Sequence, residues 1–189
     1  KKKEKLRQKA DAKAADEAQE NAAQELFSET ELNRYARHIV LRELGGLGQK
    51  KLKDAKVLVV GAGGLGSPVL LYLSAAGVGR IGVVDDDVVD NSNLQRQVIH
   101  KDEAIGTPKV LSAAEAMTAQ NPFVSVVPYP YRLTEEDAAE IIGEYDLVLD
   151  GTDNFDTRYL VNEVCVAQGK PLISGALSQW EGQLRNKKR

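Results

Sequence analysis

Cysteine, aromatic residues and long apolar runs are scarce in this chain of 189 residues, and each scarcity excludes a class of protein. The single cysteine, Cys165, excludes an intramolecular disulfide framework and a zinc site built from four cysteines. Aromatic residues make up 5% of the chain, which does not favour a base-stacking platform for nucleic acid. No apolar run approaches the roughly 20 residues that cross a bilayer. We therefore expect a cytoplasmic protein that binds neither nucleic acid nor membrane.

The net charge of −3 conceals an uneven distribution. Residues 1–9 carry six basic side chains and one acidic one, and residues 185–189 (RNKKR) carry four basic ones. Residues 10–184 are left with 15 basic and 27 acidic side chains, a net charge of −12. The first residues are rich in Ala, Lys, Glu and Gln and lack Gly and Pro. We therefore predict a charged helix over 1–28 and a solvated basic tail over 185–189.

Helices and strands alternate between these ends. Ser28 and Glu31 have the spacing of a capping box, which predicts a helix from Ser28. Three glycines (45, 46 and 48) then interrupt the chain before a short helix over 49–53. Short apolar runs typical of buried parallel strands follow, alternating with helical segments, over 56–60, 80–84, 124–127, 146–149 and 171–174. This order predicts an α/β fold: a doubly wound, mostly parallel Rossmann-like sheet with helices on both faces, preceded by N-terminal helices.

A glycine-rich loop, GAGGLG over 61–66, joins the first predicted strand to an apolar helix. Glycines let a backbone approach phosphate closely, and a helix N-terminus presents free N–H groups to an anion. Asp85 ends the second strand, nineteen positions after Gly66, where a carboxylate would accept from ribose hydroxyls. The loop therefore indicates an adenine-nucleotide site. The alternative is a tight turn that packs helix against strand.

The polar run Asn91–Gln97 bears on which nucleotide binds, since the loop fits both NAD and ATP. Arg96 has no obvious use in hydride transfer, whereas phosphoryl or nucleotidyl transfer develops charge that a guanidinium can meet in fork geometry. Lys109, in the first turn of the next helix, is placed to reach back to the same cleft. The alternative for Lys109 is an ordinary solvated lysine.

The segment Asp150–Asn154 (DGTDN) closes the fourth predicted strand at the same edge of the sheet. A carboxylate beside a triphosphate usually holds Mg²⁺ through one or two oxygens. Asp153 and Asn154 are equally good N-caps for the helix that follows. The two interpretations are compatible if Asn154 caps the helix and Asp153 binds the metal.

Taken together, these motifs resemble the adenylating domain of the ubiquitin-activating-enzyme superfamily, in the bacterial branch of molybdopterin-synthase and thiazole-biosynthesis adenylyltransferases. The resemblance is continuous from about residue 31 to residue 184, and the motifs follow the family's order. The segments that carry it are RYARHIVL (34–41), GAGGLGS (61–67), VDDDVVDNSNLQRQ (84–97), GTPKV (106–110), LVLDGTDN (147–154) and PLISGALSQWEGQ (171–183).

The resemblance implies a reaction. A ubiquitin-like sulfur-carrier protein would present its C-terminal Gly-Gly carboxylate to ATP·Mg²⁺, giving the carrier acyl-adenylate and pyrophosphate. It implies catalytic roles for Arg37, Arg96, Lys109 and Asp153, with Asp153 orienting the metal and Arg37 reaching the phosphates of a neighbouring subunit, so that a homodimer is expected. The nucleotide-binding set is Gly61, Gly63, Gly64, Gly66, Asp85, Ser92, Asn93, Leu94, Gln95, Arg96, Lys109, Asp153 and Asn154.

The chain departs from the family after residue 183. Members of the family continue with a further strand, paired C-x-x-C zinc motifs and a loop with a reactive cysteine, whereas this sequence ends in RNKKR. We therefore expect an incomplete adenylation domain over 29–184 without Zn²⁺ ligands, for which adenylation by the fragment itself is doubtful. The pathway, molybdopterin or thiamine, is left open by these residues.

Two other functional classes compete with adenylation. A non-catalytic, nucleotide-binding or scaffolding relative would keep the loop without the reaction, and an NAD-dependent oxidoreductase would use the same loop for hydride transfer. We expect structural or surface roles for the isolated His38 and His100, a core position for Cys165, and surface or ion-pair positions for Arg42 and Arg158. For Trp180, packing and lining of a carrier-tail channel are both open.

Overall fold

The computed structural model describes residues 26–187 of the chain, the last of them by its backbone alone. The predicted helix over 1–28 falls almost wholly outside the described residues, as do residues 188 and 189. Of the described residues, those from 26 to 54 belong to one compact unit and those from 55 to 187 to a second. The domain predicted over 29–184 therefore contains parts of both units. No helix within the described residues is long and apolar enough to cross a membrane.

The first unit contains the helices α2 (Glu29–Ile39) and α3 (Gly45–Asp54). The predicted capping box begins α2: the Glu31 amide donates to Ser28 Oγ at 3.3 Å, and the Ser28 amide donates to Glu31 Oε2 at 2.9 Å. The glycines predicted to interrupt the chain lie inside α3, so that prediction was wrong. Gly45 is the first residue of α3 and has φ +61°, a conformation that favours glycine, and Gly46 is buried in the helix.

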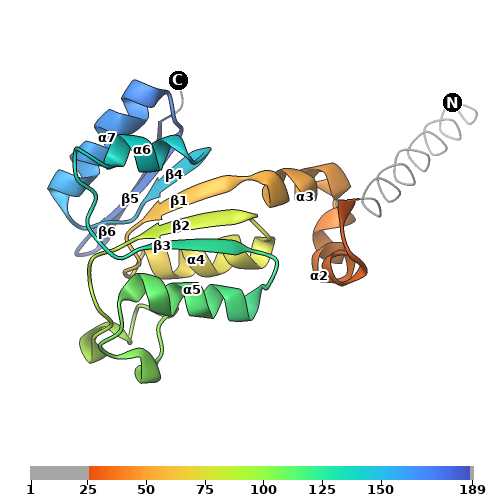
Figure 1. Ribbon diagram of the computed structural model, residues 1–189, viewed down its shortest axis with the longest axis horizontal. Helices are drawn as coiled ribbons and strands as arrows, with labels where there is room; N and C mark the ends of the chain where they lie inside the picture. Colours follow the sequence, from red (N-terminus) through yellow and green to blue (C-terminus); the bar gives the residue numbers. More distant parts are fainter. Residues whose placement is uncertain (1–25, 188–189) are drawn as a thin grey trace, which may run out of the picture. The chain divides into compact units, whose positions relative to one another are not determined.

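The second unit is built on a six-stranded sheet in the order β3-β2-β1-β4-β5-β6. Five strands are parallel, and β6 pairs antiparallel with β5 at the edge. The fold is the predicted α/β, doubly wound one, with α4 and α5 on one face and α6 and α7 on the other (Figure 1). The strands are β1 (Lys56–Val60), β2 (Arg80–Val84), β3 (Ser125–Tyr129), β4 (Leu147–Asp150), β5 (Leu172–Ser178) and β6 (Glu181–Lys187), and the helices are α4 (Gly66–Ala76), η1 (Asn91–Asn93), η2 (Asp102–Ala104), α5 (Lys109–Gln120), α6 (Ala138–Gly143) and α7 (Phe155–Gln168).

The strands form because their apolar side chains are buried on both faces, as a parallel sheet covered by helices requires. Leu58, Ile81 and Val148 are fully buried, and each such side chain contributes about 1.5–3 kcal/mol on leaving water. The ring of Tyr145 packs against Gly82, where a Cβ would collide with the tyrosine ring. The strand order reverses between β1 and β4, and such switch points open a crevice at the carboxyl ends of the strands.

The carboxyl-terminal strand differs from the prediction. Residues 185–187, predicted to begin a basic tail, belong to β6, where Arg185 pairs with Ser174 of β5. Trp180 lies in the turn between these strands and is 99% exposed, so a packing role for it within this chain was wrong.

Candidate functional site

The glycine loop leaves β1 and turns directly into α4. Gly61 has φ +95°, and its amide donates to the Val84 carbonyl at 2.8 Å. A Cβ at Gly66 would fall inside van der Waals contact with the Gly61 carbonyl oxygen, so the two ends of the loop touch. Leu65, at the N-cap position of α4, forms no side-chain hydrogen bond to the helix. The Ser67 amide already donates to the Gly63 carbonyl at 2.9 Å and Pro68 has no N–H, so Gly66 is the first-turn amide of α4 left for an anion.

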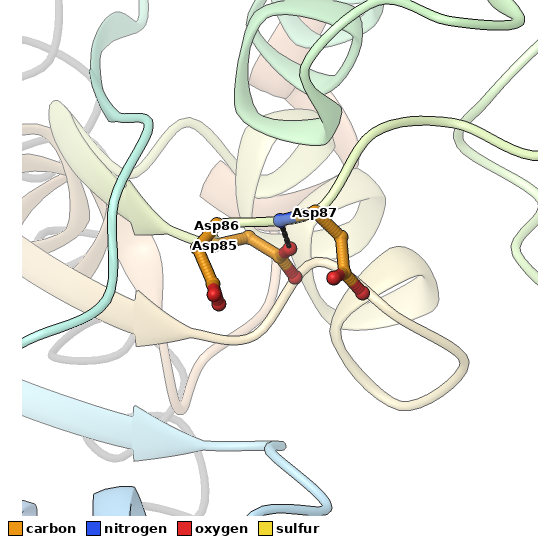
Figure 2. Close-up of side chains that lie close together, drawn as sticks. All are labelled: Asp85, Asp86 and Asp87. Carbon is orange, nitrogen blue, oxygen red and sulfur yellow. Dashed lines mark hydrogen bonds between the residues drawn. The ribbon is translucent and has the colours of Figure 1, made fainter.

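Asp85 is fixed against this loop. Its Oδ2 accepts from the Ala62 amide at 2.7 Å, and its Oδ1 accepts from the Asp87 amide at 2.9 Å (Figure 2). Burial raises the pKa of Asp85, while the hydrogen bonds from the Ala62 and Asp87 amides and the charge of Lys109 act in the opposite direction. The predicted ribose-binding carboxylate thus lies beside the predicted phosphate loop.

Lys109 is buried, so the alternative that it is an ordinary solvated lysine was wrong. It is the first residue of α5, its side chain is 6% exposed, and its Nζ donates to Asp87 Oδ2 at 2.7 Å. Pro108 occupies the N-cap position of this helix. Lys109 is close enough to Asp85 to influence its pKa. The ammonium therefore lies within the same cluster as Asp85.

The segment after β2 lies along the loop. Arg96 runs past Gly64, because a Cβ there would sit 3.7 Å from Arg96 Cδ, and its Nη1 donates to the Ser92 carbonyl at 3.2 Å. Gln97 is buried, and its Nε2 donates to Asn93 Oδ1 at 2.7 Å. The structure thus brings Asn93 and Arg96 to the glycine loop, as the motifs implied.

The loop after β4 also packs against the glycine loop. Asn154 caps α7, since its Oδ1 accepts from the Thr157 amide at 3.0 Å, and Asp153 is exposed beside it. Gly151 packs against the glycine loop, where a Cβ would lie 3.4 Å from the Gly66 nitrogen. The capping role for Asn154 is confirmed, and Asp153 is left free of that role.

Three consecutive carboxylates, Asp85, Asp86 and Asp87, each offer an oxygen within 4.8 Å of the others (Figure 2). Each already has protein partners: backbone amides for Asp85, Arg132 at 3.1 Å for Asp86, and Lys109 for Asp87. The metal ligand predicted from the sequence, Asp153, is not a member of this cluster. Its role as a metal ligand stays a prediction.

Comparison with known proteins shows to which family the chain belongs. A sequence model of the ThiF family matches residues 35–188, well over half of the chain. The chain belongs to the ThiF family. It is 55% identical over 158 residues to a sulfur carrier protein adenylyltransferase of Thermus thermophilus, covering 84% of this chain and 58% of the relative. It is 54% identical over 157 residues to the probable adenylyltransferase/sulfurtransferase MoeZ of Mycobacterium tuberculosis, covering 83% of this chain and 40% of that one.

A solved structure agrees with this membership. The crystal structure of Escherichia coli MccB with ATP superposes with a TM-score of 0.69 at 30% identity, over 79% of this chain and 46% of that one. The ThiF-family chain thus spans about two fifths to three fifths of the length of these proteins. The resemblance inferred from the motifs is confirmed.

Two side chains of this ThiF-family chain have the kind of role expected from the sequence, structural for His100 and ion-paired for Arg158, but their partners at the site were not foreseen. His100 is buried; its Nε2–H donates to the Ala62 carbonyl at 3.0 Å, so its Nδ1 accepts from Ser112 Oγ at 3.0 Å. Burial lowers the pKa of His100, and the neutral ring fits this pattern. Arg158, expected at the surface or in an ion pair, pairs with the buried Asp150 at 3.0 Å. Its spacing of eight residues from Asp150 carries no local signal.

The remaining residues singled out from the sequence are described within their own units. Arg37 is exposed on α2, in the first unit, and its contact with a neighbouring subunit remains a prediction. His38 bonds Gln49 at 2.8 Å within that unit. Cys165 is buried in the core of the second unit, as expected.

Proposed function

We propose that this ThiF-family chain carries the adenylation site for a ubiquitin-like sulfur-carrier protein whose C-terminus is Gly-Gly. The observation that carries the proposal is the clustering of Asp85, Lys109 and the uncapped start of α4 around the glycine loop. This arrangement offers a ribose acceptor, a buried cation and the close-approaching backbone of a glycine loop within one site. Relatives at 54–55% identity named as adenylyltransferases support the same conclusion.

In the proposed reaction, a carboxylate oxygen of the carrier attacks the α-phosphorus of ATP. The bond to the bridging oxygen breaks, pyrophosphate leaves, and the carrier acyl-adenylate forms. A carboxylate is already ionised at pH 7, so no protein base is needed. Lys109 and Arg96 would donate to phosphate oxygens as their charge grows, and Asp85 would orient the ribose.

Mg²⁺ is expected with the nucleotide. This ion prefers carboxylate and water oxygens and keeps several waters, which fits the solvent-facing Asp153 better than the partnered Asp85–Asp87 cluster. When bound, it would neutralise part of the triphosphate charge. We also propose a cytoplasmic homodimer in which Arg37 of one chain serves the site of the other, within molybdopterin or thiamine biosynthesis.

ATP–pyrophosphate exchange tests the function directly. We expect exchange only with a carrier that ends in a free Gly-Gly carboxylate, and none with the same carrier amidated at its C-terminus. Arg96→Ala and Asp153→Ala should reduce exchange, whereas Lys101→Ala, an exposed residue paired with Glu103, should not. Tight NADH binding without ATP binding would favour the oxidoreductase instead. ATP and carrier binding without exchange would favour a scaffolding relative.

A further inference from the structure

One guanidinium ties the loop after β4 to the neighbouring strand. Arg158, on the second turn of α7, pairs through Nε with Asp150 Oδ2 at 3.0 Å. Its Nη2 donates to the Thr152 carbonyl and, at 2.9 Å, to the Gly175 carbonyl of β5. A single planar group therefore contacts the end of β4, the loop and β5 together.

The Asp150 carboxylate contacts the same loop and the same strand. Its side chain is 1% exposed. Its Oδ1 accepts from the Thr152 amide at 3.0 Å, and its Oδ2 accepts from Ser174 Oγ at 2.7 Å. Both the amide and the carbonyl of Thr152 are thus held, one residue before Asp153. We call the Asp150–Arg158 pair with these contacts the β4–β5 clamp.

We propose that Arg158 is a positioning residue that, through the β4–β5 clamp, holds Asp153 where it can serve the metal bound with the nucleotide. The inference rests on the proposed function, since it assigns Arg158 a part in the adenylation site. Arg158 touches neither substrate nor metal in this scheme; it acts through residues 151–153.

Arg158→Lys is the informative substitution. It keeps a cation beside the buried Asp150 carboxylate but loses the planar fork that reaches both carbonyls. Arg80→Lys is the matched control: Arg80 pairs with Glu144 at 2.6 Å at the beginning of β2, the opposite end of the sheet. A second variant, Asp150→Asn with Arg158→Gln, removes both charges of the pair and avoids an unpaired buried carboxylate.

Calorimetric binding of α,β-methylene-ATP, with Mg²⁺ and with EDTA, separates positioning from general damage. We expect Arg158→Lys and the double variant to weaken binding in Mg²⁺ by about 10- to 100-fold, the loss typical when the support of a metal ligand is removed. In EDTA both should bind like the wild type, and Arg80→Lys should do so in either condition. Adding Arg158→Lys to Asp153→Asn should cause no further loss.

Four outcomes would overturn the inference. Equal weakening with and without Mg²⁺ would mean that Arg158 only supports the fold. Unchanged binding in Mg²⁺ would mean that the clamp does not act on Asp153. Losses that add in the Asp153→Asn background would mean that the two residues act separately. A wild-type chain that binds no nucleotide in either condition would refute the proposed function and this inference together.

Discussion

Substituting Gly66 by alanine tests the geometry of the glycine loop. The new Cβ would lie 2.8 Å from the Gly61 carbonyl carbon and closer still to its oxygen, both backbone atoms that cannot rotate away. Overpacking of this kind costs about 1–3 kcal/mol. Alanine in a helix recovers about 0.5–1 kcal/mol relative to glycine. Because both atoms that the Cβ meets belong to the backbone, we expect the upper part of the resulting range, a loss of up to about 2.5 kcal/mol in the free energy of unfolding.

The neighbouring glycines provide the control. A Cβ at Gly63 or Gly64 would meet its nearest heavy atom at 3.7 Å, an ordinary contact, so alanine at either position should leave stability within about 0.5 kcal/mol of the wild type. Urea unfolding of the three variants measures the difference. All three should bind ATP more weakly, because each glycine lies in the proposed phosphate loop. If Gly66→Ala were as stable as Gly63→Ala, the close approach of Gly66 to Gly61 would be wrong.

Three further predictions concern buried polar groups. Lys109→Met keeps the stem of the side chain but removes the ammonium; we expect ATP binding to weaken by about 10- to 100-fold with little change in stability, because its partner Asp87 is exposed, and unchanged affinity would remove Lys109 from the site. His100→Phe removes the 3.0 Å donor to the buried Ala62 carbonyl and leaves only the 3.5 Å contact from Ser67 Oγ, which should cost about 1–3 kcal/mol in urea unfolding; a cost below about 0.5 kcal/mol would contradict this. Burial raises the pKa of Cys165 from 9.0 to about 11, so the unfolded chain loses this proton first as pH rises. Stability should therefore fall between pH 9 and 11 by about 1.4 kcal/mol per unit more steeply in the wild type than in Cys165→Ala, and parallel pH profiles would refute the shift.

Features with local causes could be predicted from the sequence. The capping box at Ser28, the glycine loop at Gly61–Gly66 and the N-cap at Asn154 each depend on residues a few positions apart, and the structure contains all three. The apolar runs of the parallel strands are equally local, because burial on both faces leaves little choice of residue.

Features that depend on residues far apart in the sequence could not be predicted in this way. The β6 sequence, EGQLRNK, is polar, its residues 181–186 are exposed, and only its pairing with β5 makes it a strand. His100 bonds a carbonyl 38 positions earlier, and Arg158 bonds one 17 positions later. Such partners are brought together by the strand order, which periodicity predicts only as a class of fold. The residues that support a site are therefore harder to predict than those that form its motifs.

The partners of Lys109 bear on how the proposed site would accept a triphosphate. Its ammonium is nearly buried, whereas the Asp87 carboxylate that it contacts is 66% exposed and can be solvated by water. A phosphate that displaces Asp87 therefore breaks a pair that solvent weakens, and it gains a cation already desolvated and oriented by α5. Asp85 cannot yield in the same way, because two backbone amides hold it. Under the proposed function, then, Asp85 would stay beside the ribose, and Asp87 would be the carboxylate whose contact with Lys109 the nucleotide replaces.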